Sequence, residues 1–167
     1  MLTQSELMEL LDYNQKTGEV SARVASGKRK TGPIGTTNTN GYLVVIIRGR
    51  QYRLHRLAWF LTHGTWPKEI DHINGNKADN RLANLRECTR SQNQANRNGM
   101  MSTNSSGFRG VSRSGRRWQA FVAKKPLGRF PTAEQAAMAY NLAAFRKWGR
   151  FAQLNFPVRV QLPEMEG

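Results

Sequence analysis

The spacing of apolar and polar residues predicts short helices and strands along the first half of the chain. Thr3 and Glu6 have capping-box spacing and are followed by leucines at helical intervals, so we expect a helix from there to about residue 12. Residues 42–47 are β-branched and apolar, which favours the first strand of a hairpin with its tight turn at Gly49. The same reasoning predicts a strand over residues 19–24, a loop over 26–41, the returning hairpin strand over 51–54, a helix over 55–61 that ends at Gly64, a strand over 85–88 and a helix from Thr89 through Asn96.

A second pattern begins at residue 107 and predicts a small sheet followed by a helix. Thr132 and Gln135 have capping-box spacing at the start of this helix, which we expect to end near Gly149. One face of the helix carries Ala136, Ala137, Tyr140 and Ala144, and small side chains let a helix lie close to a sheet. The expected strands cover residues 108–112, 117–123 and 127–130, with turns at 114–115 and 125–126.

These patterns predict an α+β protein with two modules. The first module covers residues 1–98, the linker 99–106 and the second module 107–157, and residues 158–167 form a tail. Lysine and arginine total 26 against 11 aspartates and glutamates, a net charge of +15. Residues 104–157 alone hold ten basic residues and one acidic residue. So dense a positive charge favours a polyanionic partner such as nucleic acid.

Other features exclude several classes of protein. No apolar run approaches the roughly 20 residues of a membrane span, and the first residues lack the basic start and apolar core of a signal peptide. Cys88 is the single cysteine, so the chain has neither an internal disulfide nor a cysteine-rich zinc site. We therefore expect a cytoplasmic protein with no membrane partner.

One cluster is suited to phosphodiester hydrolysis. Asp71 and His72 are adjacent in a predicted strand, and Asn93 lies in the helix after the next strand, so the three side chains converge if these elements pack together. Histidine, with an ordinary pKa of about 6.5, suits the role of general base. Oxygen ligands from Asp71 and Asn93 favour Mg²⁺, Mn²⁺ or Ca²⁺ over Zn²⁺. The alternative is a structural Asp–His pair beside an ordinary Asn74–Gly75 turn.

Four segments around this cluster form a specific pattern, at residues 54–58, 69–77, 80–86 and 91–93. Together they resemble the His-Asn-His (HNH) endonucleases, and in particular the homing endonucleases of phage genomes and introns. The resemblance covers roughly residues 10–98. It implies a ββα-metal nuclease fold, preceded here by a small β-rich region, in a phage-infected or bacterial cell.

The resemblance also implies roles for individual residues. His72 would be the general base, and Asp71 and Asn93 would ligate one divalent ion per active site, Mg²⁺ with Mn²⁺ as the alternative. Asn84 would bridge the backbone of the polar loop and hold His72 in place. Asn93 stands where many relatives have histidine, and Asn96, one helical turn further on, is a rival ligand. His55, at the start of a predicted helix, has either a structural role or one in positioning a DNA phosphate.

The second module carries its own motifs, at residues 108–111, 118–120, 127–130, 132–140 and 154–157. They resemble the Apetala/ethylene-response-factor DNA-binding domain. The resemblance implies a three-stranded antiparallel sheet backed by one helix, with one sheet face in the major groove of double-stranded DNA. Arginine suits that face because its planar fork reaches phosphates or guanine edges. The candidates are Arg109, Arg113, Arg116, Arg117, Lys124 and Trp118, of which Trp118 is equally suited to the core.

We therefore expect a site-recognising, homing-type HNH DNA endonuclease that uses a divalent ion and no small-molecule cofactor. The first module would hydrolyse the phosphodiester, and the second would recognise DNA. The alternative is a DNA-binding or regulatory protein whose nuclease site has decayed. The sequence leaves open the target site, nicking against double-strand cleavage, and the oligomeric state.

Overall fold

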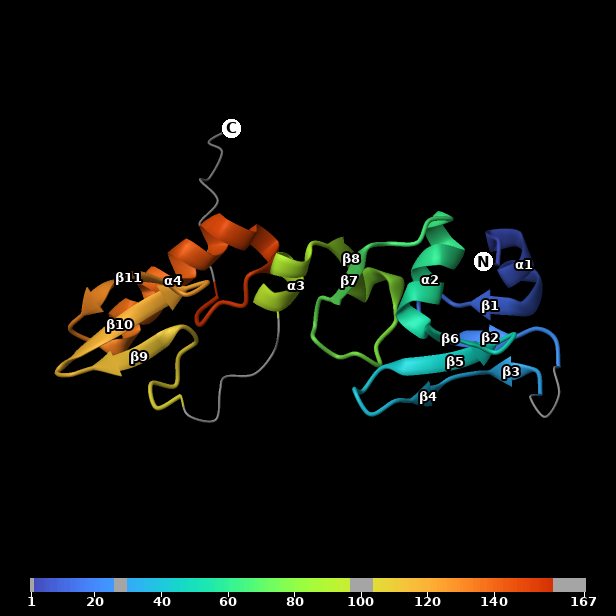
Figure 1. The fold of residues 1–167 in the computed structure, drawn as a ribbon, viewed down its shortest axis with the longest axis horizontal. Helices are drawn as coiled ribbons and strands as arrows, with labels where there is room; N and C mark the ends of the chain where they lie inside the picture. Colours follow the sequence, from blue (N-terminus) through green and yellow to red (C-terminus); the bar gives the residue numbers. More distant parts are fainter. Residues whose placement is uncertain (1, 26–29, 97–103, 158–167) are drawn as a thin grey trace, which may run out of the picture. The chain divides into compact units, whose positions relative to one another are not determined.

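The computed structural model describes residues 2–25, 30–96 and 104–157 of the chain (Figure 1). The chain divides into two compact units, unit 1 (residues 1–94) and unit 2 (residues 95–167). Both units combine helices with small antiparallel sheets, which confirms the α+β class. Part of the expected loop at 26–41, most of the expected linker and the expected tail lie outside the described residues.

Unit 1 begins with the expected capped helix, α1 (Gln4–Leu10). Thr3 Oγ1 accepts a hydrogen bond from the Glu6 backbone N–H at 3.2 Å, and Glu6 Oε2 accepts one from the Thr3 backbone N–H at 2.8 Å. The helix is shorter than expected, because Leu11 has extended backbone dihedrals and starts a strand. Gln4 Nε2 donates to the Leu61 carbonyl at 3.0 Å and so ties α1 to the distant helix α2 (Leu54–His63).

Small antiparallel sheets follow α1 in unit 1 (Figure 1). The expected hairpin is confirmed, with Gly49 at its turn. The expectation of a featureless loop over residues 26–41 is wrong, because two-residue strands form there by pairing with the longer strands beside them. The first sheet contains β1 (Leu11–Tyr13), β2 (Val20–Ala22) and β3 (Gly32–Pro33); the second contains β4 (Thr36–Thr37), β5 (Leu43–Ile47) and β6 (Arg50–Arg53); the third pairs β7 (Glu69–His72) with β8 (Leu85–Cys88).

Helix α2 supplies much of the core of unit 1. Leu54 and Leu57 are fully buried and pack with Leu7, Leu11 and Ile47 from the surrounding elements. The helix ends at Gly64, whose φ of 72° gives the left-handed cap that the sequence predicts. A 3₁₀ turn (Leu82–Asn84) leads into β8, and α3 (Arg90–Ala95) follows. Among the described residues, no helix has the length and apolar character needed to cross a membrane.

Unit 2 is a three-stranded antiparallel sheet in the order β11-β10-β9 with one helix, α4 (Ala133–Trp148), packed on it (Figure 1). Ala136, Ala137 and Ala144 of α4 are fully buried, as the alanine pattern predicts. The strands are β9 (Val111–Ser114), β10 (Arg117–Val122) and β11 (Lys125–Phe130), and a 3₁₀ turn (Gly149–Phe151) follows α4.

The strand and turn boundaries of unit 2 differ from the prediction. The expected turn at 114–115 lies one residue later, because Ser114 still belongs to β9. The first strand starts at Val111, because Gly110 has a φ of 69° and interrupts extended structure before it. The second turn lies at Ala123 and Lys124, whose φ values are 47° and 67°, and Lys125 already belongs to β11. Consecutive positive φ values are typical of the tight hairpin turns that match strand twist. Neither residue is a glycine or asparagine, so the sequence lacked the usual signal.

Candidate active site

The hairpin of β7 and β8 separates the candidate residues onto two faces, so the expected convergence of Asp71 and Asn93 with His72 is not found. Ile70 and Leu85 pack against Ala58 of α2, and His72 pairs with Leu85 in register, so His72 belongs to the face toward α2. Asp71 points to the other face. Glu69 shares that face, and Asn93 Nδ2 of α3 donates to Glu69 Oε2 at 3.1 Å, so this is the side on which α3 lies.

His72 is buried and held by the loop that follows it. Its Nε2 lies 3.2 Å from Asn80 Oδ1, and because an amide oxygen only accepts, this contact requires the proton on Nε2. Burial lowers the pKa of His72, while the Asn80 hydrogen bond and the Asp71 charge oppose that shift. The imidazole is therefore neutral near pH 7, the form in which a histidine can accept a proton from water.

Asn84 bridges the polar loop between β7 and β8. Its Oδ1 accepts from the Asn74 backbone N–H at 3.0 Å, and its Nδ2 donates to the Asp79 carbonyl at 2.8 Å. The Tyr13 hydroxyl of β1 also donates to the Asn80 carbonyl at 2.7 Å. The two ends of the loop and the adjoining sheet thus restrain the segment that holds His72. This is the bridging geometry expected for Asn84. That Asn84 supports catalysis stays a prediction.

Asp71 is paired with an arginine that the sequence reasoning missed. Asp71 Oδ2 accepts from Arg86 Nε at 2.8 Å and from Nη2 at 2.7 Å, and both side chains are buried. The two residues are register partners across β7 and β8. Removal of either side chain would break this buried ion pair, which typically costs about 3–5 kcal/mol.

The residues on the α3 face fit a hard divalent cation in chemical type. Asp71 and Asn93 offer a carboxylate and an amide oxygen, the donors that Mg²⁺ and Mn²⁺ prefer, and Arg86 shares the carboxylate. No group of three or more His, Cys, Asp or Glu side chains suited to a metal occurs in the described part of the chain. The rival ligand Asn96 lies in unit 2, where its Oδ1 accepts from Gln153 Nε2 at 3.2 Å.

His55 lies in a cluster of rings beside His72. Its ring centroid is 5.0 Å from that of His72 and 5.2 Å from that of Tyr42. The pKa of His55 is lowered to about 3, first by burial and then by the charges of His72, Arg53 and Arg56. This ring is therefore neutral at pH 7. His55 is only 4% exposed. Its position favours the structural role over a direct contact with a DNA phosphate.

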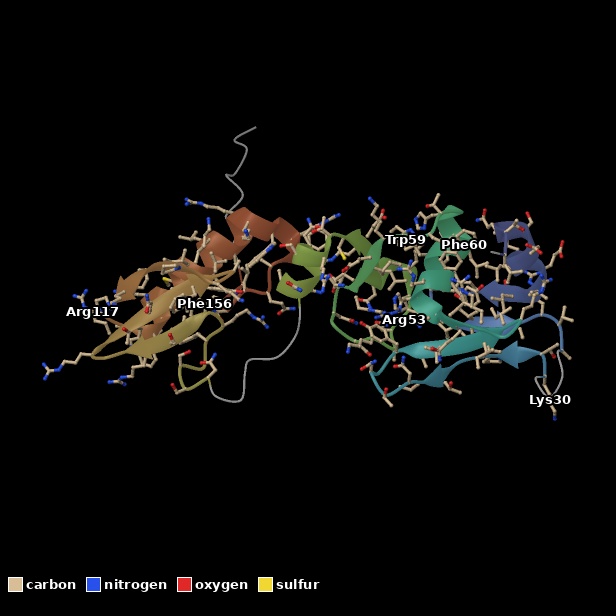
Figure 2. All side chains as sticks on the ribbon, in the orientation of Figure 1. Lys30, Arg53, Trp59, Phe60, Arg117 and Phe156 are labelled. Carbon is tan, nitrogen blue, oxygen red and sulfur yellow. The ribbon has the colours of Figure 1, made fainter. Side chains whose placement is uncertain are left out.

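The structure also places the candidate DNA-binding residues of unit 2. Ala120 and Val122 are buried toward α4, so strand alternation turns Arg117 to the open face of the sheet, away from α4. Figure 2 shows Arg117 with its side chain directed away from the ribbon. The other five candidates do not share that face, and Trp118 has the core position that the sequence left open as its alternative. Trp118 packs with the core on the α4 side, and the Arg113 guanidinium lies 5.4 Å from its ring centroid. Arg116 and Lys124 lie at turns, and Arg109 precedes β9.

Two residues of the open face were missed. Gln119 and Arg129 are register partners on β10 and β11, and their alternation with Trp118 and Phe130 turns them to the same face as Arg117. Pairing the predicted strands would have found them. We use "open face" below for Arg117, Gln119 and Arg129.

Comparison with known proteins connects this geometry to a family of nucleases. Residues 52–95 match the model of the HNH endonuclease family. That match covers β7, β8, the loop between them and the whole of α2 and α3.

Two relatives extend the comparison. An uncharacterized HNH endonuclease of Acanthamoeba polyphaga mimivirus is 37% identical over 123 residues, which is 70% of this chain and 63% of that protein. Ethylene-responsive transcription factor 1 of Solanum lycopersicum is 55% identical over 40 residues, 24% of this chain and 16% of that protein. The chain therefore spans less than two thirds of either relative.

Proposed function

We propose that the chain is a metal-dependent, homing-type DNA endonuclease in which unit 1 cuts the phosphodiester bond and unit 2 recognises the DNA. The observation that carries this proposal is a buried, neutral His72, held by Asn80 and preceded in sequence by Asp71, within a segment that matches the HNH endonuclease family. We assign β7, β8 and α3 as the ββα-metal element of this nuclease.

In this proposal, His72 accepts a proton from the water that attacks phosphorus. Asn80 and Asn84 are positioning residues, because they hold the imidazole and the loop that follows it. Asp71 and Asn93 would hold one Mg²⁺ or Mn²⁺ ion, which supplies stabilisation of the charge on the phosphoryl and leaving oxygens. Departure of the 3′ oxygen leaves 5′-phosphate and 3′-hydroxyl ends.

The direct test is cleavage of supercoiled plasmid DNA by the full chain. We expect nicked or linear DNA with Mg²⁺ or Mn²⁺ and intact plasmid with excess EDTA, and we expect DNA ligase to reseal the product ends. Stable DNA binding without cleavage in any divalent metal would contradict the proposal and support the decayed-nuclease alternative.

For unit 2, we propose that the open face lies against double-stranded DNA. Its two arginines point away from α4, and residues 104–157 carry the charge excess that a polyanion would neutralise. Gln119 adds a side chain able both to donate to and to accept from base edges.

The double variant Arg117→Gln/Arg129→Gln should bind duplex DNA more weakly and with a shallower dependence on salt. Each lost phosphate contact lowers the slope of log affinity against log salt by about one. The matched control is Arg113→Gln, because that arginine lies against Trp118 on the other side of the sheet. Binding measured at several salt concentrations checks this, and an equal loss in the control would contradict the assignment of the open face.

A further inference from the structure

Unit 1 has a basic, aromatic pocket whose lining is not part of the β7–β8 hairpin. It has a volume of about 580 Å³, within the range of small-ligand sites. We call it the Tyr52 pocket. Its lining includes four cationic side chains and no acidic one, and the residues that matter here are Arg50, Tyr52, Arg53, Arg56, Trp66 and Lys68.

The aromatic wall of the pocket is anchored in the core. Trp66 stacks on Phe60 of α2 with ring centroids 4.2 Å apart and an angle of 9° between planes, and Tyr52 stacks on Trp66 at 5.9 Å and 24°. Figure 2 labels Phe60 on α2, with Arg53 near the start of that helix. Tyr52 and Trp66 are half-buried, so part of each ring faces the pocket. A ring held this way loses little entropy when a ligand stacks on it.

The cations of the pocket differ in what they already contact. Arg56 donates to the Pro67 and Lys68 carbonyls at 2.6 and 3.3 Å, so it closes the loop beneath the pocket. Arg50 lies 5.7 Å from the Tyr52 ring centroid. Among the described residues, Arg50, Arg53 and Lys68 have no carboxylate partner, and all three are exposed. They are therefore available to a phosphate.

Arg53 connects the pocket to the candidate active site. Its guanidinium lies 4.7 Å from the Tyr42 ring centroid, and that centroid is 6.1 Å from the His72 ring. One nucleic-acid strand that passes Arg53 can therefore reach both places. Aromatic rings with adjacent cations are the combination that binds unpaired nucleotides, because the base stacks while the phosphate pairs with the cations.

We propose that the Tyr52 pocket binds one unpaired nucleotide of the DNA strand, with its base against Tyr52 and its phosphate against Arg50, Arg53 and Lys68. The nucleotide is unpaired, because bases within a duplex already stack on both faces and must be extruded before a protein ring can contact them. The choice of DNA rests on the proposed function, but binding requires no hydrolysis.

The test measures binding of fluorescent oligothymidylate to the full chain in EDTA, so that cleavage plays no part. Tyr52→Leu should weaken this binding by about 5–100-fold, the range for loss of one base–aromatic stack. Tyr52→Phe should bind like the native protein, because it keeps the ring.

Heparin, a polyanion without bases, should bind equally to all three proteins. Arg50→Gln should weaken binding of both ligands, and Lys16→Gln, an exposed lysine of the same unit, should weaken neither.

Photocrosslinking locates the contact. Bromouracil in the oligonucleotide should crosslink to peptides that contain Tyr52 or Trp66. A folded Tyr52→Leu protein with unchanged oligothymidylate affinity would overturn the proposal, as would crosslinks confined to unit 2. Plasmid cleavage distinguishes the two proposals: cleavage without pocket binding overturns only this one, and pocket binding without cleavage overturns only the nuclease.

Discussion

Replacement of His72 with alanine should lower the DNA cleavage rate by about 10²–10⁴-fold, the usual contribution of a general base. Affinity for DNA should change little, because His72 is 5% exposed and its ring contacts lie within the protein. The measurement is single-turnover cleavage of plasmid DNA in Mg²⁺, with binding measured separately in EDTA.

Two further variants make this result interpretable. His72→Gln keeps a polar group beside Asn80, so it separates loss of the base from loss of the Asn80 contact. His63→Ala removes an exposed histidine that stacks on Trp59 at the end of α2, and it should cleave at the native rate. A wild-type rate in both folded His72 variants would refute the assignment of His72 as the base.

Gly18→Ala should lower the free energy of unfolding of unit 1 by about 2–6 kcal/mol, from a left-handed backbone and a steric clash together. Gly18 has a φ of 79°, and a β-carbon there would lie 2.5 Å from the Arg81 nitrogen and 2.6 Å from the Asn80 carbonyl carbon. Both neighbours are backbone atoms, so neither can rotate away. Because Asn80 holds His72, the cleavage rate should fall along with the stability.

Gly49→Ala is the matched control. Gly49 has nearly the same φ, 75°, but nothing lies within 4 Å of a β-carbon there. It should lose only the backbone term, about 1–3 kcal/mol, and keep its cleavage rate per folded molecule. Chemical denaturation of both variants, followed by cleavage assays, measures the difference. Equal losses of stability in the two variants would show that the clash with the Asn80 and Arg81 backbone contributes nothing to the effect of Gly18→Ala.

The elements predicted well from sequence are those set by neighbours in the chain. The capping box at Thr3, the left-handed cap at Gly64 and the hairpin turn at Gly49 each depend on a few adjacent residues. The two-residue strands β3 and β4 depend instead on strands elsewhere, so no local pattern marks them. The turn at Ala123 and Lys124 was missed because its residues are not typical of positive φ.

The candidate site divides in the same way. The motif around Asp71 and His72 could be read from the sequence, and its segment matches the HNH endonuclease family. The partners of these residues could not, because the Arg86 ion pair needs the strand register and the Asn80 contact needs the path of the loop. On the sheet of unit 2, the sequence left Trp118 open between the DNA face and the core, and the strand register turns Trp118 toward α4 and Arg129 away from it.

The long-range ties within unit 1 have a consequence for the order of folding. The bond from Gln4 to Leu61 closes a separation of 57 residues, and the bond from Tyr13 to Asn80 closes one of 67. Unit 2 has a shorter tie, from the Arg109 backbone N–H to Asn155 Oδ1 over 46 residues, around a sheet of two consecutive hairpins. Because loop closure lowers the chain entropy before distant contacts can form, topologies with mostly local contacts fold faster. On the ribosome, α1 and β1 therefore gain these partners only after residues 61 and 80 have been synthesised.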